Sequence, residues 1–222
     1  MPHAYDSIPP NLQQWALEQP MFCTASAPLR GRHVNLSPKG VPSTTFAILD
    51  ENHCAYLDFA ASGAETISHI YENGRVTVMF CSFGPKPRIL RFYCTGSVIE
   101  YNDPEFHPMI KRMGLEYITG VRAVVLLDVW KVLPTLDKEA HQQHTIENAD
   151  QEIQKTGQLT KPPCKCYQDR HMLEQWLENK TNKKALDGYL AIWNSRSVDG
   201  LPALKAARTI NGEWLLVGDV PP

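Results

Sequence analysis

The chain has 222 residues, 43% of them hydrophobic, and its 22 basic and 24 acidic side chains give a formal net charge of −2. That length allows one large domain or two small ones with a sizeable core. The balanced charge does not favour nucleic acid as a partner, and no apolar run is long enough to cross a bilayer. Six scattered cysteines are too few for a disulfide scaffold, and the N-terminal residues lack the pattern of a secretory signal. We therefore expect a cytoplasmic protein that binds neither nucleic acid nor membranes.

The N-terminal part of the chain reads as one helix followed by short strands. Leu12, Trp15 and Ala16 recur at helical spacing after two prolines, which predicts an opening helix. The strand-like segments that follow are 21–27, 33–37, 45–49 and 54–59. In the second of these, Asn35 and Ser37 alternate with apolar residues, so both should lie on one polar face.

A helix with clear end signals comes next. Ser62 and Glu65 have the spacing of a capping box, in which the two side chains satisfy free backbone N–H groups at the helix start. Asn73 and Gly74 supply a left-handed stop. The helix should therefore run from about Ser62 to Asn73.

Long strands and a second set of helices fill the rest of the sequence. Segments 76–82 and 88–99 predict two strands, the second with a bulge at Gly96, and 121–130 is apolar on both faces as in a central strand. A polar, helix-compatible insertion and linker spans about 135–166. Peripheral helices are expected within 167–200, at 169–179 and 183–193, and an edge strand at 213–217. Short strands joined by short loops predict a mostly antiparallel barrel.

The start of the helix at Ser62 is a candidate anion site. Free N–H groups and the helix dipole favour negative charge there, Gly63 allows close backbone approach, and Ser62 and Thr66 add hydroxyl donors. Lys39 at the end of the second strand could supply a positive charge. The same residues also have plain structural explanations. Ser62 and Glu65 could simply cap a helix, and Lys39 could be a solvated surface charge.

Six segments in a fixed order carry a family resemblance. They are 33–40, 55–58, 62–66, 72–81 and 88–91, with a closing segment at 194–203. Together they resemble the pyridoxamine 5'-phosphate oxidase-related group of FMN-binding split barrels. The resemblance implies a mostly β fold with flanking helices, in which residues 1–222 form a single split β-barrel domain. It also implies a homodimer that binds FMN at the interface between its subunits.

The resemblance further implies roles for particular residues. Residues Ser62, Gly63, Thr66 and Lys39 would hold the FMN phosphate, Asn35 and Ser37 would reach the ribityl chain or the ring edge, and Arg88 and Arg91 would complete the pocket from the partner chain. The implied activity is an FMN-dependent oxidoreduction of an unidentified small molecule, for which NAD(P)H could serve as the reductant. No side chain is identified as the catalytic acid or base, since His33 and Tyr93 qualify only by residue type.

The chain departs from the family pattern at three places. Ala47 stands where relatives commonly have arginine, Ala64 replaces an asparagine, and 131–135 replaces a segment containing Ser-Cys-Gly. An arginine lost from a phosphate site would remove a charge-assisted contact worth about 1.5–3 kcal/mol. The alternative function is therefore a split barrel that has lost flavin and binds or rearranges a small hydrophobic ligand without redox chemistry.

Histidines and cysteines in the second half of the chain are a candidate metal site. His141 and His144 are three residues apart, and Cys164, Cys166 and His171 follow. Histidines at that spacing share a helical face and could chelate zinc together with thiolates. The two cysteines do not form a CxxC pair, however, and no second pair exists. We expect no metal site.

Overall fold

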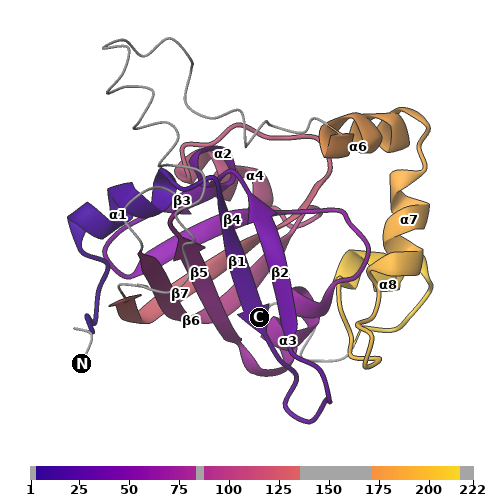
Figure 1. Cartoon of the computed structure of the whole chain (residues 1–222). Coiled ribbons are helices and arrows are strands. Elements are labelled where there is room, and N and C mark those ends of the chain that lie inside the picture. The colour runs from indigo at the N-terminus through magenta and orange to yellow at the C-terminus, as the bar shows by residue number, and fades with distance from the viewer. Residues whose placement is uncertain (1–3, 84–87, 136–171, 216–222) are drawn as a thin grey trace, which may run out of the picture.

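The computed structural model describes residues 4–83, 88–135 and 172–215. Its centre is a seven-stranded antiparallel sheet in the order β2-β1-β5-β6-β7-β4-β3 (Figure 1). The strands are β1 Met21–Ser26, β2 Asn35–Gly40, β3 Phe46–Ile48, β4 His53–Phe59, β5 Arg75–Cys81, β6 Ile89–Glu100 and β7 Val121–Thr135. The helices are α1 Pro10–Leu17, α2 Pro42–Thr45, α3 Glu65–Asn73, α4 Phe106–Arg112, α6 Met172–Asn182, α7 Leu186–Trp193 and α8 Lys205–Ile210.

The sheet curls so that its two ends meet. Strand β2 is at one edge, and β4 is next to the other, yet Lys39 Nζ on β2 lies 2.7 Å from Asp58 Oδ1 on β4. Side chains, and not a backbone ladder, therefore join the two ends at a seam. The outer edge of β2 carries Pro38, which has no N–H to donate.

Aromatic side chains fill the inside of the curled sheet. Strands β1 and β5 alternate between buried and half-buried residues, which places one face of each strand in the core. Phe22, Phe46 and Phe80 pack there with ring centroids 5.1–5.7 Å apart, and Phe92 and Tyr56 extend the cluster. We call these five residues the aromatic core. Helix α1 adds Leu12 and Ala16 to the same cluster.

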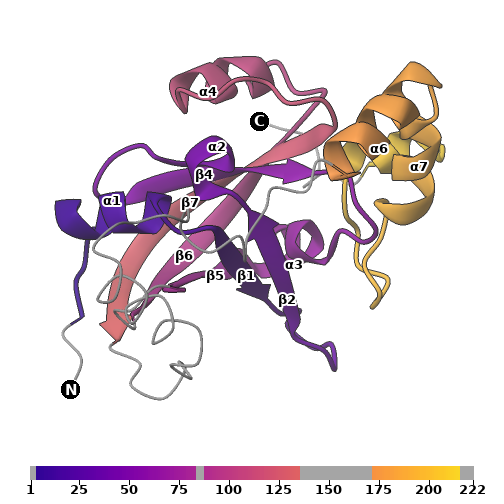
Figure 2. The same cartoon turned by 45° about the horizontal axis from the view of Figure 1, so that its top comes forward.

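Two further helical layers cover other parts of the sheet. Helix α4 packs Phe106 and Ile110 against β4 and β7, whose first residues are buried on both faces. Helices α6, α7 and α8 gather on the side of α3 (Figure 2), where Leu177 packs in one cluster with Ile67. Gly120 has φ of +89°, and a Cβ there would lie 2.5 Å from Leu177, so only glycine permits this close approach.

Most of the expected elements are present, and the expected left-handed stop is confirmed at Gly74, whose φ is +70°. The ladder irregularity of β6 falls between Tyr93 and Cys94, so the bulge expected at Gly96 was wrong. A Cβ at Gly96 would lie 3.1 Å from Ile70, so this glycine makes room for α3. Helices α2, α4 and α8 were not expected. Residues 213–215 form no strand, and the insertion expected at about 135–166 lies outside the described residues, except for the end of β7 at Thr135.

Strand β7 continues to Thr135, five residues beyond its expected end at Trp130. The altered segment 131–135 is therefore the end of a strand that pairs with β6. Among the described helices, none combines the length and apolar character that a bilayer crossing requires.

Candidate functional site

A cavity of about 160 Å³ lies where β2 meets the turn before α3. We call it the polar cavity. Six of the eight residues expected to bind the cofactor line it, namely Asn35, Ser37, Lys39, Ser62, Gly63 and Thr66. The register explains the contribution of β2, because Asn35, Ser37 and Lys39 pair with Ser26, Thr24 and Phe22, which are buried on the inner face. The structure thus brings the segments 35–39 and 62–66 together.

Three charged side chains form an ionic group beside the cavity. Asp58 accepts hydrogen bonds from Lys39 Nζ at 2.7 Å and from Arg122 Nε at 2.8 Å. Asp58 is 1% exposed and Arg122 5%. Burial alone would raise the pKa of the Asp58 carboxyl, but the positive charges of Arg122 and Lys39 outweigh it and lower the pKa to about 2. We call these three residues the ionic group.

Arg122 also fixes the turn that precedes α3. Its guanidinium donates to the carbonyl of Gly63 at 2.9 Å, and the Asn194 amide donates to the carbonyl of Ala61 at 2.8 Å. Asn194 is fully buried. The turn is therefore held from two sides, by a strand residue and by the closing segment 194–203.

Helix α3 begins at Glu65, and its N-cap is Ala64 without a side-chain cap, so the expected capping box was wrong. The Glu65 carboxylate instead accepts a hydrogen bond from the backbone N–H of Val198 at 3.3 Å. Gly63 has φ of +83°, and a Cβ there would lie 2.4 Å from Glu65 Oε2. Since Ala64 carries no capping oxygen, the N–H groups of the first turn of α3 receive no cap from it.

Asn35 is already engaged by protein groups. Its amide donates to Thr66 Oγ1 at 2.9 Å and to Ser26 Oγ at 3.4 Å. These bonds tie β2 to the first turn of α3. The amide of Asn35 therefore positions the Thr66 hydroxyl at the cavity wall.

Arg88 and Arg91 do not line the polar cavity of their own chain. The Arg88 guanidinium lies over the Trp15 ring, 5.3 Å from its centroid. Arg91 is opposite Met79, which is linked through β1 to Pro38. Paired residues share a face, so Arg91 lies on the face of the sheet opposite Ser37 and Lys39. A role from a partner chain stays a prediction.

Ala47 and Ala64, two of the departures from the family pattern, differ in where their side chains lie. Ala47 packs with Leu57 and Phe106 on the side of β3 that faces α4, away from the aromatic core. The Ala47 side chain does not line the polar cavity. Ala64 is 2% exposed and is the N-cap of α3, so its side chain adds no polar group there.

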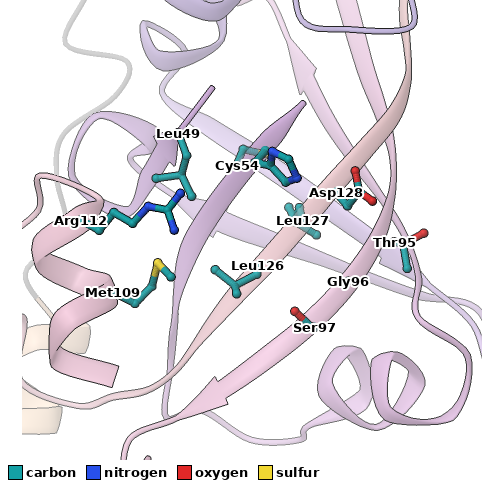
Figure 3. A pocket seen from close by; sticks show the side chains of 11 residues that line it. Leu49, Cys54, Thr95, Gly96, Ser97, Met109, Arg112, Leu126, Leu127 and Asp128 are labelled. Carbon is teal, nitrogen blue, oxygen red and sulfur yellow. The ribbon is translucent and has the colours of Figure 1, made fainter. Parts of the chain in front are cut away.

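Two other hollows adjoin the sheet. A cavity of about 280 Å³ between α4 and strands β4, β6 and β7 is lined by Met109, Arg112, Leu126 and Asp128 among others (Figure 3), and it contains none of the expected site residues. We call it the large cavity. An apolar hollow of about 170 Å³ shares Lys39 and Phe59 with the polar cavity and extends to α6. A polar and an apolar compartment therefore meet at Lys39.

Sequence reasoning missed Asp58, Arg122 and Asn194. The signal in the sequence was a single charge inside an apolar run, since Arg122 stands among valines and Asp58 follows Tyr56 and Leu57. A charge that is buried in a strand requires a partner. Which partner it has depends on how the sheet curls, and the local sequence does not contain that information.

Comparison with known proteins identifies the family. No family model matches the chain. The pyridoxamine 5'-phosphate oxidase family protein ustO of Aspergillus flavus is 46% identical over 222 aligned positions, which cover 97% of this chain and 83% of the relative. Among solved structures, HupZ of Group A Streptococcus gives a TM-score of 0.45 at 18% identity and covers 58% of this chain and 99% of that one. An FMN-binding protein from Syntrophomonas wolfei gives 0.40 at 17%, and covers 56% and 89%.

The ustO relative shows the family, because its 46% identity extends over 97% of this chain. The chain belongs to the pyridoxamine 5'-phosphate oxidase family.

Proposed function

We propose that the protein is an FMN-dependent oxidoreductase that acts on a small molecule. One observation carries the proposal: the polar cavity gathers the start of α3, Lys39 and Arg122 in a member of the pyridoxamine 5'-phosphate oxidase family. A helix start and two cations are the groups that bind a phosphate dianion. The substrate and the reductant, for which NAD(P)H is our candidate, belong to the proposal.

The residues of the polar cavity fit the polar part of FMN. Gly63 leaves the backbone accessible, and the hydroxyls of Ser62 and Thr66 can donate to phosphate oxygens. Asn35 and Ser37 lie along β2 at the same cavity, where hydroxyls of a ribityl chain would find partners. The adjoining apolar hollow, lined by Leu57, could accept a flat ring. When bound, the flavin supplies the hydride chemistry, and the protein orients substrate and ring.

The proposal includes a homodimer in which Arg88 and Arg91 approach the cavity of the partner. The polar cavity of one chain is smaller than the 300 Å³ or more typical of a ligand pocket, at about 160 Å³. Leu36, on the outer face of β2, is 63% exposed, and Val34 just before it is 74% exposed. Exposed apolar side chains beside an incomplete pocket favour a second subunit there.

A second candidate function rests on the charge balance of the same cavity. The carboxylates of Asp58 and Glu65 match the positive charges of Lys39 and Arg122, which leaves no net positive charge for a dianion. The large cavity, lined partly by Met109 and Leu126, offers an alternative place for an apolar ligand. This candidate is the barrel that has lost flavin and binds a small hydrophobic molecule without redox chemistry.

An FMN titration separates the two candidates. Purified protein is mixed with excess FMN, passed through gel filtration, and its visible spectrum is recorded together with the quenching of flavin fluorescence. Retained, quenched FMN supports the first function. Protein that emerges colourless and shows no quenching or thermal shift overturns it in favour of the second.

Two substitutions test whether the FMN phosphate binds at the start of α3. Thr66→Asp puts a negative charge at the first turn of α3 and should abolish FMN retention by repulsion. Lys39→Met should weaken FMN binding roughly tenfold or more, the effect of losing one charge-assisted contact. Lys205→Met is the matched control, because Lys205 lies over the Tyr71 ring much as Lys39 lies over Tyr56, but away from the cavity. Unchanged retention by a folded Thr66→Asp variant would exclude this phosphate site.

A further inference from the structure

Two histidines and an aspartate from three separate segments meet next to the polar cavity. His33 precedes β2, His69 is in the middle of α3, and Asp199 belongs to the closing segment. One side-chain donor atom from each lies within 4.8 Å of the others. His33 Nδ1 and Asp199 Oδ2 are 2.8 Å apart, and the two imidazole rings have centroids separated by 5.4 Å.

One ring nitrogen of His69 is buried without a hydrogen-bond partner among the described residues. The residue is fully buried, and its Nδ1 forms a hydrogen bond of 2.9 Å with Ser26 Oγ. Its Nε2 is also buried and has no hydrogen-bond partner among the described residues. Buried polar atoms in folded proteins are almost always paired, so one that faces other ligand-type groups points to a missing partner. The same holds for Nε2 of His33, which is buried and unpaired as well.

We propose that His33, His69 and Asp199 bind a divalent first-row transition metal ion, with Zn²⁺ as the probe. Imidazole nitrogens together with one carboxylate form a common donor set for these ions, and they leave a coordination position open. Ligand bonds of about 2.0–2.2 Å at tetrahedral angles place donor atoms roughly 3.3–3.6 Å apart. The donor atoms here lie within 4.8 Å of one another, so binding an ion requires side-chain rotations that bring the most distant donors closer by about an ångström.

The surroundings of the three residues suit a cation. Burial and the neighbouring His33 lower the pKa of His69, which favours its uncharged imidazole form. The hydrogen bond of Nδ1 to Ser26 fixes the ring and leaves Nε2 free, as an outer partner does in metal sites. Gly31 permits the approach of Asp199, because a Cβ at position 31 would lie 2.5 Å from Asp199 Oδ2.

A metal ion here would join the closing segment 194–203 to α3 and to the start of β2. That segment already holds the turn at the polar cavity through Asn194 and the Glu65 carboxylate through Val198. The proposed ion therefore stabilises one wall of the polar cavity without being part of it. The proposal does not depend on flavin binding and is tested on flavin-free protein.

The test is a competitive Zn²⁺ titration of full-length, tag-free protein after chelator treatment. The chain has six cysteines and eight histidines, so the titration uses a Cys164→Ser, Cys166→Ser background to remove the CxC thiolates. We expect one tightly bound Zn²⁺ per chain. His33→Ala and Asp199→Asn should each weaken its binding roughly tenfold or more.

His53→Ala is the matched control. His53 Nδ1 also lies 2.8 Å from a carboxylate oxygen, that of Asp50, but on the surface and without a second histidine in the described cluster. Zn²⁺ binding should be unchanged in this variant. Circular dichroism checks that every variant is folded, and Co²⁺ absorption bands report the same site. Absence of stoichiometric Zn²⁺, or tight Zn²⁺ that persists in folded His33→Ala and Asp199→Asn, overturns the proposal.

Discussion

The aromatic core and the Asp58–Arg122 pair of the ionic group are both buried, with Lys39 half-buried beside that pair, but different interactions hold the two regions in place. Phe80 is fully buried and Asp58 is 1% exposed. The aromatic core gains from burying area, which is non-directional and tolerates exchange of one apolar residue for another. The ionic group gains only if every charge keeps its partner, because a buried charge left alone is costly. The aromatic core should therefore tolerate exchange of one apolar residue for another, whereas the ionic group at the seam should not tolerate the loss of a charge.

The largest effect should come from removing the shared carboxylate. Asp58→Ala leaves Lys39 and Arg122 without their counter-charge, and we expect a loss of about 5 kcal/mol in the free energy of unfolding, at the top of the range for a broken buried pair. Urea denaturation followed by circular dichroism measures it. A loss below about 1 kcal/mol would show that the seam is hydrated and that the contrast with the aromatic core does not hold.

The next effect tests the core itself. Phe80→Ala removes a ring that contacts Phe22, Phe46 and Phe92, and should cost about 4 kcal/mol through lost burial and a residual cavity. Phe80→Leu should cost much less, since the site stays apolar and nearly filled. Both are measured by urea denaturation. Equal losses in the two variants would mean that the core is as unforgiving as the seam.

A pH dependence distinguishes the two regions without a large structural change. The folded pKa of Asp58 is about 2, below its ordinary value of 3.8, so the unfolded chain takes up a proton first as pH falls. The contribution of Asp58 is complete above about pH 4 and is lost as pH falls toward 2, a change of about 2 kcal/mol. Unfolding free energies at pH 5 and pH 2.5 should show this loss in Phe80→Leu but not in Asp58→Asn. The same slope in both would assign the loss to other carboxyl groups.

The smallest effect concerns an ion pair of the same type at the surface. Arg196 donates to Glu213 at 2.7 Å, but its side chain is 50% exposed. Arg196→Ala should therefore change the unfolding free energy by about 0.5 kcal/mol or less, and salt should screen even that. Thermal unfolding at low and high salt measures it. A loss comparable to that of Asp58→Ala would show that burial is not what separates the two ion pairs.

Local sequence patterns predicted the strands of the sheet and the end of α3. They did not predict every helix or the contacts between segments that are far apart in the sequence. Alternating residues gave the strands, and Gly74 gave the end of α3, because both depend on neighbours in sequence. Helices α4 and α8 were missed because they have only seven and six residues, too few for a helical periodicity to be recognised. The helix start was placed at Ser62 on a capping-box pattern that the structure does not use.

The candidate site was predicted only in part, because the sequence reveals residues that are neighbours in the chain but not those that the fold brings together. Residues Asn35 to Lys39 and Ser62 to Thr66 were found because each set is contiguous in sequence, and the structure brings the two sets to one cavity. Asp58 and Arg122 were not found, since their partners are set by the curl of the sheet. Likewise His33, His69 and Asp199 are spread over 167 positions of the chain, and only the folded structure brings them together.

Pro38 on the outer edge of β2 influences how this protein can self-associate. An edge strand with free N–H groups is a template for further strands, and a proline there interrupts the row of donors. Runaway fibril growth from this edge is therefore disfavoured, even though Leu36 and Val34 beside it expose apolar surface. Any contact between copies at this edge would therefore depend on the exposed apolar side chains and not on a continued backbone ladder.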